Sequence, residues 1–156
     1  MSETRTANQA GYSAAIPVRT DGVLSRRLFA YLIDLVVIAV LTALFGILIG
    51  VAGLVTFGLG WVLYAVLVPG TAILYSALTV GGTGTGTFGM RMTGLTAVDV
   101  QTGGPIGYLL AGLHALMFYV GIGTLLLLVL DLLIGFARED RRLGHDLLAG
   151  LIVARR

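Results

Sequence analysis

The sequence predicts an all-α integral membrane protein with four membrane segments, one of them short enough to be re-entrant, and a small cytoplasmic loop and strand element. Two observations predict this class. Hydrophobic residues make up 57% of the 156-residue chain and charged residues only 12%, whereas an average soluble domain carries about 25% charge. Charged residues are also absent from 35–90 and from 100–130, and each stretch exceeds the roughly 20 apolar residues that cross a bilayer.

The same totals exclude several other classes. Disordered and nucleic-acid-binding proteins carry far more charge than this chain. The absence of Cys excludes disulfides and thiolate metal sites, and the net charge of +2 is too small to predict an anionic partner. The partner that the composition predicts is the lipid bilayer, together with further copies of the chain or another membrane protein.

The chain divides into a predicted disordered cytoplasmic tail, 1–22, and a transmembrane domain, 23–156. The first predicted helix runs from Ser25, its expected cap, to Gly50. It is not a signal peptide, because the apolar stretch is too long and contains Asp34. Small residues at close to four-residue spacing on one side of this helix permit close helix contact: Ala39, Ala43, Gly46 and Gly50.

The second predicted helix runs from Trp61 to Leu78, and Pro69 should kink it. Its aromatic residues, Trp61, Tyr64 and Tyr75, fit the aromatic belts of membrane interfaces. A polar loop, 81–105, follows. Alternation from Arg91 to Val100 predicts a strand, and the stretch Leu151–Ala154 is also strand-like, so the two strands are expected to pair beside the membrane.

The apolar stretch 106–136 is too long for one membrane helix. It would be roughly 46 Å long at 1.5 Å per residue, against a hydrocarbon core of about 30 Å. Gly121 and Gly123 predict a break, which gives two short passes, 106–120 and 122–136. Four, zero, one and five Arg residues lie in the successive exposed segments, so the positive-inside rule predicts that both termini are cytoplasmic.

Two acidic residues, Asp34 and Asp131, lie within apolar helical sequence, where a charge costs about 2.5–3.5 kcal/mol. Arg27 precedes Asp34 by seven residues, and Arg138 follows Asp131 by seven, so each pair shares a helix face. These mirror-image pairs suggest a shared cation or proton site. The alternative is that each Asp pairs with an Arg and fixes helix packing.

Other polar features give weaker predictions. The stretch Gly84–Gly89 matches G-x-G-x-x-G, but it follows a membrane helix rather than a strand, so nucleotide binding is not expected. His114 is expected to be a hydrogen-bonded packing residue or a proton relay. His145 and Asp146 are neighbours in sequence and should not face one another. No metal set and no nucleophile–base pair can be assembled, so the sequence predicts no catalytic residue, no metal, no cofactor and no enzyme activity.

Three segments resemble the RDD family of bacterial membrane proteins: SRRLFAYLIDLVV, TFGMRMTGLTAVDVQTGG and RRLGHDLLAGLIVARR. The first segment corresponds to the family's opening Arg and Asp. The second corresponds to its T-x-G-K-R loop. The third corresponds to its closing R-x-x-H-D-x-x-A-G segment. Met90 stands where the family usually has Lys, and Leu151 where it often has Thr. The residues that match the family motif are Arg27, Asp34, Thr87, Gly89, Arg91, His145 and Asp146.

The resemblance implies that Arg27 is the naming Arg and Asp34 the first naming Asp. The second is Asp146, with Asp131 as the alternative. It also implies a bacterial cytoplasmic (inner) membrane protein of uncharacterised function, with transport, including cation/proton exchange, suggested for some members.

Two functions remain open. The first is a transporter or transporter subunit with a cation or proton site at Asp34 and Asp131, which four short segments would enclose only as a homo-oligomer. The second is a membrane scaffold or assembly factor in which the Arg and Asp residues serve packing. A hydrated cavity that reaches both acids favours transport, and dry Arg–Asp pairs favour the scaffold.

Overall fold

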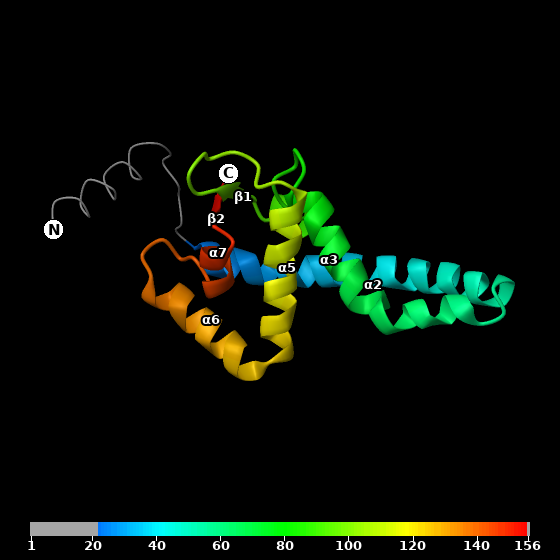
Figure 1. Ribbon diagram of the computed structural model, residues 1–156. Coiled ribbons are helices and arrows are strands. Elements are labelled where there is room, and N and C mark those ends of the chain that lie inside the picture. Colours follow the sequence, from blue (N-terminus) through cyan, green and yellow to red (C-terminus); the bar gives the residue numbers. More distant parts are fainter. Residues whose placement is uncertain (1–21, 156) are drawn as a thin grey trace.

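A computed structural model describes residues 22–155 of the chain (Figure 1). The predicted disordered tail therefore lies outside the described residues, except for Gly22. The elements, in chain order, are α2 (Val23–Val55), η1 (Leu59–Val66), α3 (Leu67–Val80), α4 (Phe88–Met92), β1 (Leu95–Asp99), α5 (Tyr108–Gly123), α6 (Leu125–Ala137), α7 (Gly144–Leu148) and β2 (Leu151–Arg155).

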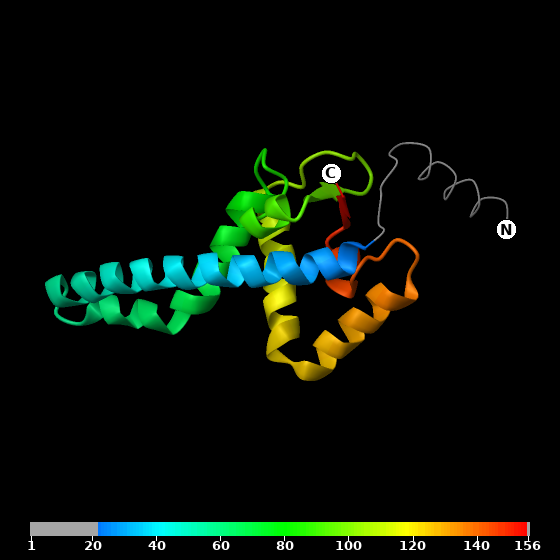
Figure 2. The same cartoon turned by 180° about the vertical axis from the view of Figure 1, so that it is seen from behind.

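Helix α2 begins earlier and ends later than the sequence predicts. It starts after Gly22, whose φ of 65° lies in the left-handed region that glycine adopts readily. Ser25 is not the cap, because its hydroxyl lies inside the first turn and donates to the Gly22 carbonyl at 2.9 Å. The 33 residues of α2 make a helix of roughly 50 Å, which Figure 2 shows as one straight rod.

The second membrane segment packs back on α2 through small residues. Tyr64 donates its hydroxyl to the Gly46 carbonyl at 2.7 Å. The indole of Trp61 lies so close to Gly53 that any Cβ there would collide with it. The predicted close contact along this side of α2 is therefore made within one chain, at Gly46 and Gly53, as a helical hairpin.

Pro69 lies where the second segment changes its helix type. The 3₁₀ helix η1 ends at Val66 and the α-helix α3 begins at Leu67. Pro69 thus occupies the first turn of α3, where its missing N–H is not needed for the helix. The hydroxyl of Tyr75 in α3 donates to the Asp34 carboxylate at 2.7 Å, and the expected aromatic belts stay a prediction.

The two predicted strands pair with one another. Strand β1 runs antiparallel to β2, with Ala97 opposite Val153. Alternate residues of the pair point into the core, where Leu95 and Leu151 are completely buried. The first strand is shorter than predicted, because residues 88–92 form helix α4, whose cap Thr87 accepts a hydrogen bond from the Met90 N–H.

The apolar stretch after the polar loop forms two helices, α5 and α6, with a bend of 118° between them. The break falls at Thr124, one residue beyond the predicted glycines. The helices have 16 and 13 residues, or roughly 24 Å and 20 Å, so each is shorter than a hydrocarbon core of about 30 Å.

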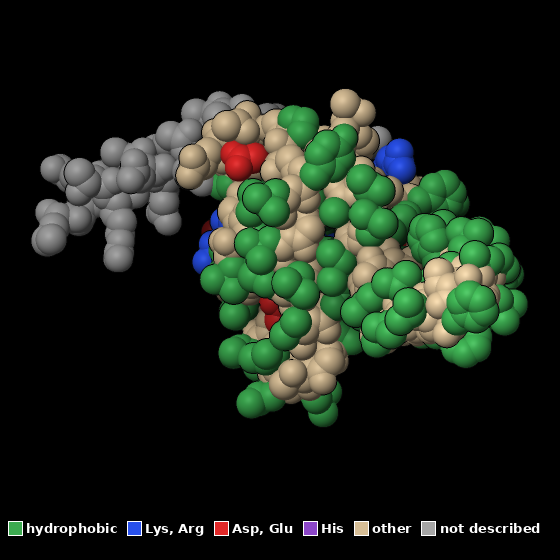
Figure 3. Space-filling view, turned by 45° about the vertical axis from the view of Figure 1, so that its right-hand side comes forward, with side chains coloured by type: hydrophobic (Ala, Val, Ile, Leu, Met, Phe, Trp, Pro, Cys, Tyr) green, Lys and Arg blue, Asp and Glu red, His purple; other side chains and the backbone are tan. Residues whose placement is uncertain are grey.

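Length and composition allow two membrane-crossing helices, α2 and the segment Leu59–Val80, and a third if the bent pair counts as one span. Hydrophobic side chains cover much of the face seen in Figure 3. The structure thus defines a mostly helical membrane protein. The expected four membrane segments would be α2, Leu59–Val80, α5 and α6. That all four enter the membrane stays a prediction, because only the first two are long enough to cross it.

The beginning of α2, the strand pair and α7 gather in one region, away from the tip of the α2–α3 hairpin (Figures 1 and 2). Arg26 ties the start of α2 to this region, because its Nη1 donates to the Thr93 carbonyl at 2.7 Å. The start of α2, the segment that connects α3 to α5 and the segment that follows α6 therefore lie together at one end of the described structure.

Cysteine labelling tests this arrangement, because the chain has no Cys of its own. We expect a maleimide that cannot cross the membrane to label Gln101→Cys and Glu139→Cys from the same side, and Phe57→Cys, at the hairpin tip, from the opposite side. All three positions are exposed. The Arg distribution predicts that the shared side is cytoplasmic. Labelling of positions 101 and 139 from opposite sides would contradict the paired strands.

Candidate functional site

Asp34 joins three helices through hydrogen bonds. Its side chain is buried, with the residue only 7% exposed. One carboxylate oxygen accepts from the Tyr75 hydroxyl at 2.7 Å and from the Gly89 N–H at 2.8 Å. The other oxygen accepts from the Thr87 hydroxyl at 2.5 Å. Asp34 therefore clamps α2 to α3 and α4, and neutral groups supply all of these hydrogen bonds.

Gly89 makes this clamp sterically feasible. A Cβ at Gly89 would overlap the Ala30 carbonyl oxygen and lie 2.9 Å from Cγ of Asp34. The backbone of α4 can approach α2 closely enough to donate to the carboxylate only because residue 89 has no side chain. This contact gives a physical reason for Thr87 and Gly89 in the sequence motif.

Asp146 is the centre of a second buried network. The residue is completely buried in α7. Its Oδ2 lies 2.5 Å from Nη2 of Arg27 and accepts from the Leu143 N–H at 3.1 Å. The contact with Arg27 is an ion pair rather than a well-directed hydrogen bond, because Nε and Nη2 of Arg27 have no hydrogen-bond partner among the described residues.

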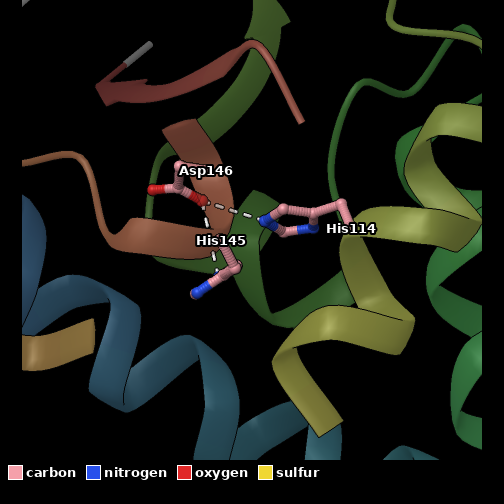
Figure 4. Close-up of side chains that lie close together, drawn as sticks. All are labelled: His114, His145 and Asp146. Carbon is pink, nitrogen blue, oxygen red and sulfur yellow. Dashed lines mark hydrogen bonds and ion pairs between the residues drawn. The ribbon is translucent and has the colours of Figure 1, made fainter. Parts of the chain in front are cut away.

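The second oxygen of Asp146 faces both histidines of the chain. Oδ1 lies 2.9 Å from Nε2 of His114 and 3.5 Å from Nε2 of His145 (Figure 4). Burial raises the pKa of Asp146, but the Arg27 guanidinium and then the two imidazoles outweigh it, so the pKa lies well below its ordinary value. The carboxylate is therefore ionised at neutral pH.

Asp131 supports one of these histidines from α6. Its Oδ1 accepts from the His145 backbone N–H at 2.9 Å, and its Oδ2 lies 2.8 Å from Nδ1 of His145. A carboxylate at Nδ1 selects the tautomer that carries its proton there and leaves the Nε2 lone pair free. The rings of Phe118 and His145 also pack together, with centroids 5.3 Å apart. We call His114, Asp131, His145 and Asp146 the His–Asp cluster.

A cavity of about 570 Å³ lies between α5, α6 and α7 and reaches this cluster. Asp131 and His145 line it, together with mostly apolar side chains that include Leu116, Phe118 and Ile134. Asp34 is not among its lining residues. The cavity thus gives access to one of the two predicted acidic residues.

The structure does not form the mirror-image Arg–Asp pairs. Arg27 shares a face of α2 with Asp34 but pairs with Asp146. Arg138 pairs with Asp140, with nitrogen–oxygen distances of 2.8 and 2.7 Å, instead of Asp131. The reason is that α6 ends at Ala137 and Arg138 is extended, so seven residues no longer correspond to two helical turns.

Asp34 and Asp131 also fail to form one shared site. The hydrogen-bond partners of Asp34 come from α3, α4 and the cap before α4, whereas those of Asp131 come from His145 alone. The expected single acidic site is therefore replaced by two separate networks. Helix α2 contributes one residue to each network: Asp34 is the centre of the first, and Arg27 pairs with Asp146 in the second.

The expectation that His145 and Asp146 do not face one another is also wrong. Asp146 is the third residue of the short helix α7, and its carboxylate turns back to the Leu143 N–H, as in half of a capping box. This turn brings it beside the His145 ring. His114 lies in α5, 32 positions before Asp146, and no spacing rule could have predicted their contact.

The Gly-rich loop packs closely against residues of the same chain. Gly84 lies near the Arg91 side chain, because a Cβ there would be 3.3 Å from Nη1 of Arg91. Arg91 in turn reaches the Thr87 carbonyl with its Nε at 3.4 Å. The helix after the loop, α4, has only five residues, unlike the long helix that follows a dinucleotide-binding loop.

Three atoms of the His–Asp cluster have the chemistry and spacing of metal ligands. One ring nitrogen of His114, one ring nitrogen of His145 and a carboxylate oxygen of Asp146 lie within 4.8 Å of one another. The sequence did not predict this set, because its three residues become neighbours only when α5 packs against α7.

Long apolar helices that surround buried ionisable networks define a membrane protein with an internal polar site. The sequence model of the RDD family matches residues 22–150. The chain therefore belongs to the RDD family. None of the curated proteins and none of the solved structures compared with it shows significant similarity.

Proposed function

We propose that the protein is a cation transporter, or a subunit of one, in the bacterial cytoplasmic membrane, and that the His–Asp cluster is its cation site. The single observation that carries the proposal is a buried cluster of ionisable groups at the wall of a cavity. Ionisable groups are expensive inside a membrane protein and mark ion pathways by default. The implied transport role of the family agrees with this site.

The charge of the network favours a cation. The network contains two carboxylates, Asp131 beside His145 and Asp146 beside Arg27, and one guanidinium, that of Arg27. With neutral imidazoles, the network has one net negative charge. A negative charge in a low-dielectric site attracts a positive ion, and an anion would be repelled.

The strand pair supports a re-entrant arrangement of α5 and α6. Helix α5 begins nine residues after β1 ends, and α6 is followed by α7 and β2. Because β1 and β2 are hydrogen-bonded to one another, both ends of the bent pair return to the same region. We propose that α5 and α6 enter and leave on the cytoplasmic side, so that the cluster is reached from there and both termini are cytoplasmic.

The second candidate is a membrane scaffold or assembly factor, and Asp34 is the observation that favours it. Neutral donors satisfy its carboxylate, and Asp34 does not line the cavity between α5, α6 and α7. If the His–Asp cluster served only packing in the same way, the protein would hold its fold without moving an ion.

Flux measurements separate the two candidates. In proteoliposomes we expect flux of at least one cation from a panel of H⁺, Na⁺, K⁺, Mg²⁺ and Zn²⁺. Asp131→Asn and His145→Gln should each reduce this flux to background, because they remove groups at the cavity wall. The matched control is Arg138→Gln, which removes a charge from an exposed ion pair and should leave the flux unchanged. Absence of flux with folded protein for the whole panel would leave the scaffold as the function.

A further inference from the structure

We propose that the His–Asp cluster binds a divalent transition-metal ion such as Zn²⁺ through Nε2 of His114, Nε2 of His145 and Oδ1 of Asp146. This inference rests on the proposed function, because it names the class of cation that the same site accepts. The family motif includes two of the three ligands, His145 and Asp146, whereas His114 lies outside it.

The distances suit such an ion. Tetrahedral zinc with ligands at about 2.0–2.2 Å has ligand atoms roughly 3.3–3.6 Å apart. The Asp146 Oδ1 lies 3.5 Å from Nε2 of His145, within that range, and 2.9 Å from Nε2 of His114, slightly below it. A ring nitrogen of each histidine and a carboxylate oxygen of Asp146 all lie within 4.8 Å of one another, so the side chains would have to move closer to the ion when it binds.

The ligand types select the class of metal. Imidazole nitrogens favour Zn²⁺, Cu²⁺, Ni²⁺ and Fe²⁺, whereas Mg²⁺ and Ca²⁺ prefer sets of oxygen ligands. The chain contains only two His residues, and both lie in this cluster, with ring centroids 4.7 Å apart. A site with two imidazoles and one carboxylate is thus matched to a transition metal.

Asp131 gives the site the supporting carboxylate that metal-bound histidines usually have. It accepts from Nδ1 of His145 at 2.8 Å and from the His145 backbone N–H. The imidazole is therefore held in one orientation, with Nε2 directed toward Asp146. The same carboxylate lies at the cavity wall, which places an entry path beside the ligands.

The two carboxylate oxygens of Asp146 have different roles: Oδ2 makes structural contacts, and Oδ1 is directed toward the proposed metal site. Arg27 and the Leu143 N–H hold Oδ2. Among residues 22–155, the polar contacts of Oδ1 are with the two imidazoles alone, so it is the oxygen available to a metal. The Arg27 contact fixes the carboxylate while leaving the network with a net negative charge.

The test uses the full chain in detergent, purified with a tag that contains no His and stripped with EDTA. We expect ZnCl₂ to raise the melting temperature in a saturable way, with about one ion bound per chain, because a ligand that binds only the folded state stabilises it. MgCl₂ at the same concentrations should have no effect. CoCl₂ should produce visible d–d absorption without a thiolate band, because the chain has no Cys.

Three variants locate the ion. Asp131→Asn should weaken Zn²⁺ binding by about 10–100-fold, as loss of a supporting carboxylate typically does. His114→Gln and His145→Gln each remove a ligand and should weaken it at least as much. The control is Asp140→Asn, which removes a carboxylate outside the cluster and should bind Zn²⁺ as the natural chain does. Melting curves recorded without metal show which variants fold, and His114→Gln, whose side chain is 18% exposed, is the one least expected to disturb folding.

The outcomes separate this inference from the proposed function. Saturable Zn²⁺ binding that depends on His114, without cation flux in proteoliposomes, supports the metal site and overturns the transport proposal. Flux of H⁺, Na⁺ or K⁺ without saturable Zn²⁺ binding supports transport and overturns the metal site. Zn²⁺ binding that is equal in the natural chain and in His114→Gln also overturns it.

Discussion

Replacing Arg27 by Gln should lower the free energy of unfolding by about 3–5 kcal/mol, the usual cost of removing one partner of a buried ion pair. The remaining partner, Asp146, is completely buried, and its carboxylate would lose the guanidinium that is paired with Oδ2. Gln can still donate a hydrogen bond, but it carries no charge. The measurement is unfolding of the purified chain in mixed micelles, followed by circular dichroism.

A double variant shows whether the loss comes from the ion pair. Arg27→Gln with Asp146→Asn removes both charges, so it should be less destabilised than the sum of the single variants, by about 0.5–3 kcal/mol. The control, Arg138→Gln, breaks an exposed pair and should change stability by less than about 1 kcal/mol. Equal effects of Arg27→Gln and Arg138→Gln would contradict the central role of Asp146.

The helices and strands could be predicted because their signals are local. Uninterrupted apolar sequence defines α2 and α3, and the glycines near residue 122 mark the break between α5 and α6. The strand pair was also predictable, because β1 and β2 are the two alternating stretches outside the membrane segments. The helix α4 was missed, although Thr87 is the type of residue that caps a helix.

The candidate site could be predicted only in part, because its contacts connect residues far apart in sequence. Seven-residue spacing correctly places Arg27 and Asp34 on one face of α2, but it cannot say which element packs against each of them. For Arg138, the spacing rule fails because the helix has already ended. The motif resemblance named His145 and Asp146, whereas nothing in the sequence connected His114 with them.

Helix α2 organises both networks along one face. Asp34 binds α3 and α4, and two turns earlier Arg27 binds Asp146 of α7. Each residue therefore holds a different part of the chain against the same helix. This division explains why the chain uses one Arg and two Asp residues, Asp34 and Asp146, without any direct pairing of Arg27 with Asp34. It also separates packing, at Asp34, from the ionisable cluster near the cavity.

Replacing Asp34 by Ala should have the other large effect, a loss of at least about 3 kcal/mol in the free energy of unfolding. The substitution leaves the Tyr75 hydroxyl, the Thr87 hydroxyl and the Gly89 N–H without their acceptor, and each unsatisfied buried group costs about 1–3 kcal/mol. Gly89→Ala should also destabilise, because its Cβ would overlap Ala30. The measurement is again unfolding in mixed micelles.

Asp34→Asn is the more informative variant of the clamp. Relief of carboxylate desolvation alone predicts a gain in stability, but Asn has a single acceptor oxygen for three donors, so we expect a loss. The control on the same helix is Thr42→Val, which removes a buried hydroxyl that has no partner among residues 22–155 and should be neutral or stabilising.

Because Asp34 and Asp131 share no partner, combining Asp34→Asn with Asp131→Asn should be additive in the free energy of unfolding within about 0.5 kcal/mol. A coupling well above that value would show that the two acids act as one site after all, and the assignment of packing to Asp34 would be wrong.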